Sequence, residues 1–183
     1  MKYKIERNTV QETLILPLYS RKLCSELYPN LYRDETAVRL IDQIDYDFSV
    51  AEKNSRSLMQ RFGALEVAMR QCDLAWEVRD YLKTHPCAAV FFASGVFYYF
   101  LTQQVRELVQ GMADAFPGGV LVFDAANRTA VKMIAKTWLK TAKIKDVGAY
   151  FAVSDAKSEL SPWDSRLQVS SRGYMLGYSD LKD

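Results

Sequence analysis

Apolar residues recur at helical spacing through the first half of the chain. The clearest stripe consists of six residues three or four positions apart, Leu58, Phe62, Leu65, Met69, Cys72 and Trp76. This spacing predicts one buried face of a helix that continues to about Leu82. His85 and Pro86 then stop the helix, and His85 is expected to lie at its C-terminus, where an imidazole interacts favourably with the helix dipole.

Two shorter helices are predicted before this one. A helix over about 9–27 is predicted from four apolar residues on one side of it, Val10, Leu14, Leu18 and Leu23. Pro17 either kinks this helix or limits its first turn. Asp34 is expected to cap a second, short helix. Residues 45–49 are expected to form a loop, so the first half is predicted to be mainly helical.

The second half alternates between uncharged apolar runs and helical patterns. Residues 87–93 and 120–123 carry no charge and predict two fully buried strands. Helical spacing predicts one helix from about Thr102 to Phe116 and another over 129–140. Two later runs predict a strand or hairpin, Leu167–Val169 and Tyr174–Leu176. Strand, helix, strand and helix in this order predict an α/β fold with a parallel sheet covered by helices.

Composition narrows the class of protein. The chain has 183 residues, of which 49% are hydrophobic and 25% charged, so it can form the core of one ordinary domain spanning 1–183. With 24 Lys and Arg against 22 Asp and Glu, the net charge of +2 offers no reason to expect nucleic acid or an anionic membrane as a partner. The longest uncharged run, 87–100, is too short for a membrane span. No targeting segment is evident, so we expect a soluble, cytoplasmic protein.

The inventory of reactive residues excludes several chemistries. The three cysteines, Cys24, Cys72 and Cys87, include no C-x-x-C pair and are expected to be buried, reduced thiols. With a single histidine, they do not form a zinc-binding pattern. The sequence also contains no G-x-S-x-G, no P-loop and no G-x-G-x-x-G motif. Metal, hydrolase and kinase functions are therefore disfavoured.

Five segments, taken in order, carry a family resemblance. They are Val10–Tyr19, Arg70–Leu82, Phe91–Phe100, Phe116–Asp124 and Leu160–Asp164. This ordered set resembles the leucine carboxyl methyltransferase family, and in particular its bacterial branch related to tetracenomycin polyketide O-methyltransferases. The resemblance implies a Rossmann-like class I methyltransferase sheet over about 87–183 with an N-terminal helical cap over about 1–84. It also implies S-adenosylmethionine as cofactor and methyl transfer to a carboxyl or hydroxyl oxygen.

The chain departs from the family pattern at its centre. Relatives carry a glycine-rich turn of the form N-L-G-x-G after the first strand, and no such motif occurs here. Val90 instead runs directly into Phe91, which resembles a later strand. We therefore expect a shortened sheet that lacks the central cofactor-binding segment, and the chain also stops at Asp183, before the last strand of the family. A sequence that omits residues of a longer natural protein is an alternative explanation.

The resemblance assigns two candidate cofactor-binding residues. Arg70 matches an arginine that binds the cofactor carboxylate, a role that suits a planar, bidentate guanidinium. From the residues alone, pairing with Glu66 or Asp73 on the same helix is the favoured alternative. Ser94 follows a strand at a position where many relatives have glutamate, and it either contacts the ligand or simply forms a turn with Gly95.

The remaining candidates are three substrate-binding residues and Asp124. Tyr19, Arg21 and Tyr99 are substrate-binding candidates carried over from the family, although Tyr99 belongs to an aromatic cluster that is also typical of a core. Asp124 ends an apolar run, so it either faces the ligand crevice or caps the helix that starts near Thr129.

Two functions of different classes stay open. The first is an S-adenosylmethionine-dependent O-methyltransferase, or a shortened form of one, acting on a small-molecule or other acceptor with a carboxyl or hydroxyl oxygen. The second is a non-catalytic remnant that serves as a binding or self-associating module. A sheet that has lost strands exposes unpaired edges, which favour a homodimer.

Overall fold

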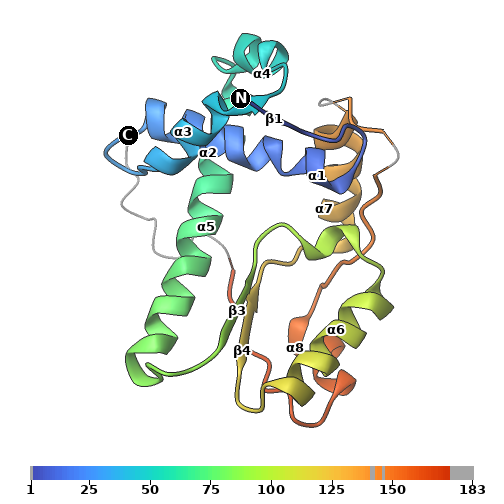
Figure 1. Ribbon diagram of the computed structural model, residues 1–183. Helices are drawn as coiled ribbons and strands as arrows, with labels where there is room; N and C mark the ends of the chain where they lie inside the picture. Colours follow the sequence, from blue (N-terminus) through green and yellow to red (C-terminus); the bar gives the residue numbers. More distant parts are fainter. Residues whose placement is uncertain (1, 141–142, 146, 174–183) are drawn as a thin grey trace. The chain divides into compact units, whose positions relative to one another are not determined.

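Figure 1 shows the computed structural model, which describes residues 2–140, 143–145 and 147–173. The chain divides into two compact units. The first unit comprises Met1–Met69 with Leu139–Val147, and the second comprises Arg70–Trp138 with Gly148–Asp183. The elements are helices and two small parallel sheets, so the protein is mixed α/β, as predicted.

Helices dominate the first unit. They are α1 (Val10–Thr13), α2 (Ile15–Leu27), α3 (Glu35–Asp42), α4 (Ser49–Asn54) and the start of α5 (Leu58–Thr84). The predicted helix over 9–27 is thus two helices that meet at Leu14, and Pro17 lies in the first turn of α2. A proline is tolerated there because the first amides of a helix have no intrahelical partner.

Asp34 caps α3, which confirms its predicted role. Its Oδ1 accepts a hydrogen bond of 2.8 Å from the backbone amide of Ala37. Helices α2 and α3 pack against each other. Their buried residues include Ile15, Ser20, Leu23, Cys24, Ala37 and Ile41.

A short parallel pair of strands in the first unit is absent from the elements predicted above. Strand β1 (Tyr3–Lys4) pairs with β2 (Ile44–Asp45) in the register Tyr3 with Ile44. The segment 45–49, predicted as a loop, therefore begins in β2 and ends at the first residue of α4. With two residues in each strand, there is no alternation of apolar and polar positions for a pattern to detect.

The long predicted helix is confirmed as α5, but its predicted buried face is only partly correct. Leu58, Phe62 and Trp76 are 84%, 59% and 50% exposed. The fully buried positions of the helix include Ala64 and Ala68 instead. Periodicity of large apolar residues identifies side chains that share a face, but it does not identify the face that neighbouring elements cover.

The second unit contains the predicted parallel pair. Strands β3 (Val90–Ala93) and β4 (Val120–Phe123) pair in the register Val90 with Val120 and Ala93 with Phe123. The connection between them passes through the 3₁₀ turn η1 (Phe97–Tyr99) and helix α6 (Thr102–Ala115). The predicted strand over 87–93 is therefore shorter at its start, and the strand over 120–123 has its predicted bounds. The prediction that both are fully buried is wrong, because their residues are half-buried and Phe92 is exposed.

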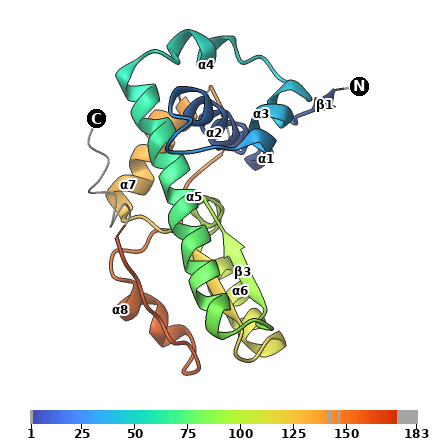
Figure 2. The ribbon, with the colours of Figure 1, turned by 90° about the vertical axis from the view of Figure 1, so that its left-hand side faces the viewer.

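The core of the second unit joins α6 to the two strands, beside which α6 runs in Figures 1 and 2. Its buried members are Phe97, Val105, Phe151, Val153 and Leu160, with Ala93, Leu121 and Phe123 of the strands packed against them. The aromatic rings stack edge to face or tilted, with the centroids of Phe97 and Phe123 5.0 Å apart. This core packs against the last residue of each strand, Ala93 and Phe123.

The remaining elements follow β4. Helix α7 (Arg128–Met133) continues into a π-helical turn, η2 (Ile134–Leu139), and α8 (Ala156–Leu160) continues into the 3₁₀ turn η3 (Ser161–Trp163). The helix predicted over 129–140 is thus present with a change of helix type. Leu167–Val169 forms no strand in the part of the chain that the structure describes, and Tyr174–Leu176 lies outside that part.

Two further expectations concern cysteines and membranes. Cys24 is buried as expected, but Cys72 is half-buried and Cys87 is exposed, so that expectation is wrong for Cys87. Within the described ranges, none of the three takes part in a disulfide. Among the described residues, no helix combines the length and apolar character that crossing a bilayer requires.

Candidate functional site

The candidate site lies at the carboxyl ends of β3 and β4. Because the strands are parallel, these ends meet at the same edge of the sheet. At this edge, the amide of Asp124 donates a hydrogen bond of 3.4 Å to the carbonyl of Ala93. The turn Ser94–Gly95 follows β3 directly, and Asp124 follows β4. Both candidate positions therefore stand at the edge where ligands bind in open α/β sheets.

The carboxylate of Asp124 is the centre of this site. Its side chain is fully buried, yet donors from three segments converge on it. The Gly95 amide donates to Oδ1 over 2.5 Å, and the Tyr98 hydroxyl donates to Oδ2 over 2.7 Å. Nη1 of Arg70 lies 3.5 Å from Oδ2. A buried carboxylate needs such partners to offset the cost of its desolvation.

Asp124 does not cap the following helix. That helix, α7, starts at Arg128, and its cap is Asn127, whose Oδ1 accepts a hydrogen bond of 2.9 Å from the amide of Ala130. The capping role considered for Asp124 is therefore wrong. Its side chain instead accepts hydrogen bonds from two donors that follow β3 and forms an ion pair with Arg70 of α5.

Arg70 reaches the site from α5. Its ion pair runs to Asp124 on another element, whereas Asp73, the neighbour on its own helix, pairs with Arg172 at 3.9 Å. The Arg70 side chain is 19% exposed. Its Nε is buried and has no hydrogen-bond partner in the described part of the chain. The guanidinium thus combines one fixed partner with an unused, shielded donor.

Gly95 shapes the turn beside Arg70. Its φ is +67°, in the left-handed region that L side chains rarely adopt. A Cβ at this position would stand 3.3 Å from Nη2 of Arg70. Glycine therefore serves two purposes here, the turn conformation and the close approach of the guanidinium. Ser94, the cofactor-binding candidate, is half-buried in the same turn.

Tyr98 is a residue of the site that the sequence identifies only as a member of the aromatic cluster around Tyr99. It lies in η1, is buried, and directs its hydroxyl to Asp124. The neighbouring Tyr99, the substrate-binding candidate, is half-buried in the same turn. A buried tyrosine hydroxyl needs a hydrogen-bond partner, but the sequence contains no local signal that this partner is Asp124.

The other two substrate-binding candidates belong to the first unit. Arg21 donates from Nε to Oδ2 of Asp34 over 2.8 Å, and Tyr32 donates to the same oxygen over 3.0 Å. Burial would raise the pKa of Asp34, but the hydrogen bonds from Ala37 and Arg21 outweigh it and lower the pKa. Burial raises the pKa of Tyr32 to about 12. These contacts fix α3 to α2.

Tyr19 is buried in the same unit. Its ring stacks on Phe48 with centroids 5.5 Å apart. Burial raises the pKa of its hydroxyl, and the charges of Glu52 and Glu26 raise it further. The substrate roles of Tyr19 and Arg21 stay predictions, because the structure brings Arg70, Ser94 and Asp124 together within the second unit only.

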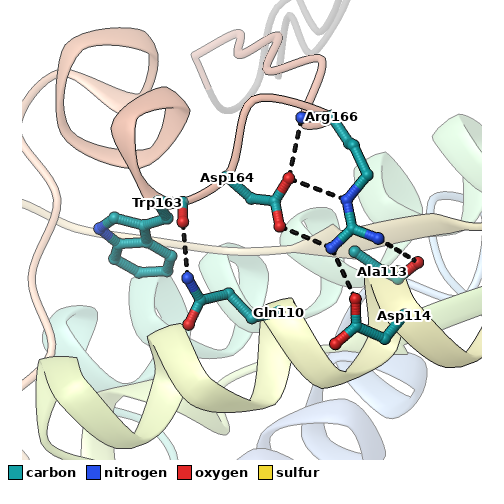
Figure 3. Close-up of polar contacts among 6 residues, drawn as sticks. All are labelled: Gln110, Ala113, Asp114, Trp163, Asp164 and Arg166. Carbon is teal, nitrogen blue, oxygen red and sulfur yellow. Dashed lines mark hydrogen bonds and ion pairs between the residues drawn. The ribbon is translucent and has the colours of Figure 1, made fainter.

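A second polar cluster lies on the surface of the second unit and is drawn in Figure 3. The guanidinium of Arg166 lies between Asp164 and Asp114, with Nη2 2.7 Å and 2.6 Å from their carboxylate oxygens. Gln110 donates to the carbonyl of Trp163 over 2.6 Å. The hydrogen bonds from Arg166 lower the pKa of Asp164 to about 2. These groups satisfy one another and fasten the segment after α8 to α6.

No family model, no curated protein and no solved structure matches this chain. Among the residues that the structure describes, no group of three or more His, Cys, Asp or Glu side chains could hold a metal ion.

Proposed function

We propose that the chain binds S-adenosylmethionine and is an O-methyltransferase of the leucine carboxyl and polyketide type, or a shortened form of one. The observation that supports this is the Arg70 guanidinium, which stands at the strand ends with a buried Nε that has no hydrogen-bond partner among the described residues. On this proposal, β3, α6 and β4 are one unit of a shortened Rossmann-like sheet. Ligands of such sheets bind at the carboxyl ends of the strands.

The residues present fit the carboxylate end of the cofactor. Arg70 has an unused donor in a shielded position, and a charge-assisted hydrogen bond to a carboxylate is strong in such surroundings. Gly95 lets the guanidinium approach the turn closely because it has no Cβ. Arg70 would hold the carboxylate, and Ser94, in the adjoining turn, would supply a polar contact. When bound, the cofactor supplies an activated methyl group.

Transfer of a methyl group to oxygen depends mainly on proximity and orientation of two bound partners. The proposed role of the chain is therefore to bind and orient, and no covalent intermediate with the protein is required. Tyr99 is the proposed acceptor-side residue of the second unit, next to Tyr98 in η1. The acceptor class is a small molecule or other partner with a carboxyl or hydroxyl oxygen.

The test is titration of the full chain with S-adenosylmethionine by calorimetry, with equilibrium dialysis as a measurement that does not depend on heat. The wild-type chain should bind, and Arg70→Lys should bind at least about tenfold more weakly, because lysine lacks the planar fork. Arg79→Lys, an exposed position on the same helix, is the matched control and should bind like the wild type. Absence of binding by both methods would overturn the proposal.

Self-association through β3 is a second candidate function, supported by the hydrogen bonding of the sheet. The amides of Val120 and Asp124 donate to the carbonyls of Ala89 and Ala93. In a parallel ladder alternate residues face the partner strand, so the backbone groups of Val90 and Phe92 point to the outer edge. Within the described residues this sheet has only β3 and β4.

The outer edge of β3 lacks the features that usually prevent pairing between chains. Phe92 is 47% exposed, and no charged residue occurs over 87–100. Natural edge strands are generally protected by charges, prolines or bulges. The occupant that fits this edge is therefore the same strand of a second copy, whose uncharged residues match it.

Light scattering of the full chain separates this candidate from a monomeric enzyme. The wild type should be a dimer, and Phe92→Lys should be a monomer because a charge on the edge opposes pairing. Leu108→Lys, at a 43% exposed position on α6, is the control and should stay a dimer. A monomeric wild type would exclude self-association as the function.

A further inference from the structure

On the basis of the proposed function, we propose that Asp124 is the positioning residue of the site. Its buried carboxylate orients the Arg70 guanidinium so that the remaining donors of this group can bind the carboxylate of a ligand. Asp124 itself is fully buried and does not touch the ligand, so it acts through Arg70 and through the turn at Gly95.

Asp124 is held in place from several directions. Oδ1 accepts from the Gly95 amide, and Oδ2 accepts from the Tyr98 hydroxyl while it pairs with Arg70. Movement of the carboxylate would leave these donors unsatisfied in a buried position, which is costly. The negatively charged carboxylate of Asp124 therefore has a fixed position within the second unit.

The position of this charge determines which N–H donors of Arg70 can bind the carboxylate of a ligand. A guanidinium has five N–H donors on three nitrogens. Asp124 lies on the Nη1 side at 3.5 Å, whereas Nε, on the opposite edge of the planar group, is the buried nitrogen without a hydrogen-bond partner in the described ranges. Nε and Nη2 form the edge that can hold a carboxylate with two parallel hydrogen bonds.

Asp124 also holds the turn against which Nη2 of Arg70 packs. Its Oδ1 accepts a hydrogen bond from the amide of Gly95, the residue whose missing Cβ lets Nη2 of Arg70 pack against the turn. One carboxylate thus couples the turn after β3 to the arginine from α5. Loss of its charge should release the guanidinium, while an isosteric amide can still accept the bond from Gly95.

The first experiment tests, without the cofactor, whether Asp124 fixes the positions of the Arg70 side chain and the Gly95 amide. In the full chain labelled with ¹⁵N, the Nε–H signal of Arg70, assigned with Arg70→Lys, and the amide signal of Gly95 are compared between the wild type, Asp124→Asn and Asp124→Ala. The Arg70 signal should shift in Asp124→Asn, which lacks the charge, and the Gly95 signal should shift in Asp124→Ala, which lacks the acceptor, while amides elsewhere in the unit keep their positions. Asp114→Asn, which removes an exposed carboxylate from α6, is the control and should leave both signals unchanged.

The second experiment measures carboxylate binding with acetate as the probe. Acetate should shift the Arg70 Nε–H signal of the wild type to saturation, and in Asp124→Asn the affinity should fall by about 10- to 100-fold, the range expected for loss of a charge-assisted contact. Titration with S-adenosylmethionine should give the same ranking of wild type and variant. If Asp124→Ala does not fold, Asp124→Asn alone decides the result.

The outcomes separate this inference from the proposed function. If acetate binds at Arg70 but S-adenosylmethionine does not bind, the methyltransferase proposal fails and the role of Asp124 stands. An unchanged Arg70 signal in Asp124→Asn, or no response of the wild type to acetate, overturns the positioning role. Tighter acetate binding in Asp124→Asn also overturns it, because Asp124 would then compete with the ligand for Arg70.

Discussion

The hydroxyl of Tyr98 and the carboxylate of Asp124 form a buried hydrogen bond of 2.7 Å at the carboxyl ends of the two paired strands. The bond joins a 3₁₀ turn after β3 to the residue after β4. It therefore ties together the two strand ends that carry the candidate site, and its removal tests how much stability the buried carboxylate draws from its donors.

Tyr98→Phe is expected to lower the free energy of unfolding by about 1–3 kcal/mol, because a buried carboxylate loses a donor that water cannot replace. Urea denaturation followed by circular dichroism measures the change. Tyr150→Phe removes a hydroxyl from a tyrosine that is 57% exposed and should change stability by less than about 0.5 kcal/mol. Equal effects of the two substitutions would mean that the bond to Asp124 contributes nothing specific.

Gly95→Ala and Gly111→Ala are expected to have opposite effects. Gly95 has a φ of +67° and lies against Arg70, so alanine should cost about 1–2 kcal/mol of stability through backbone strain alone. Gly111 lies within α6, where a Cβ would meet no atom within 4 Å, and alanine there should stabilise the helix by up to about 1 kcal/mol. Thermal denaturation of both variants checks the signs, and stabilisation by Gly95→Ala would contradict the strained turn.

The ion pair between Arg21 and Asp34 should make stability depend on pH in the acidic range. Burial opposes the charged form of Asp34, but its hydrogen bonds lower the pKa below 3.8 in the folded chain. The unfolded chain therefore binds a proton more readily, so the contribution is complete above the unfolded pKa and is lost as the pH falls through the folded one.

Asp34→Asn provides the measurement, because asparagine still caps a helix but carries no charge. The wild type should be more stable than Asp34→Asn at pH values above about 5, and the difference should shrink below about pH 4. Urea denaturation over this range checks the prediction. A difference that grows as the pH falls would show that the folded pKa is raised instead.

Arg166→Ala should raise the pKa of Asp164 from about 2 toward 3.8. The pKa should stay below 3.8, because the backbone amide of residue 166 still donates to Oδ1. Titration of the carboxyl carbon by NMR measures this value. Lys157→Ala removes an exposed cation of the same unit and should leave the pKa of Asp164 unchanged; an equal shift in that control would indicate a general effect of charge.

Local patterns predict which segments form strands and which residue caps a helix. The uncharged runs at 87–93 and 120–123 predict the strands that the structure shows as β3 and β4, and Asp34 is identifiable as a cap because its partner amide is three residues away. The β1–β2 pair escapes prediction, because two-residue strands carry no periodicity. The covered face of α5 is predicted only in part, because spacing does not say which neighbours pack there.

The sequence by itself determined the parallel α/β character of the second unit, the glycine turn after β3 and the acidic residue after β4. Only the tertiary structure decided that Asp124 binds Gly95, Tyr98 and Arg70, and that its role is not to cap α7. Periodicity and capping depend on residues within a few positions of each other. The partners of a buried charge depend instead on how distant segments pack, because desolvation makes the carboxylate bind whichever donors the fold brings to it.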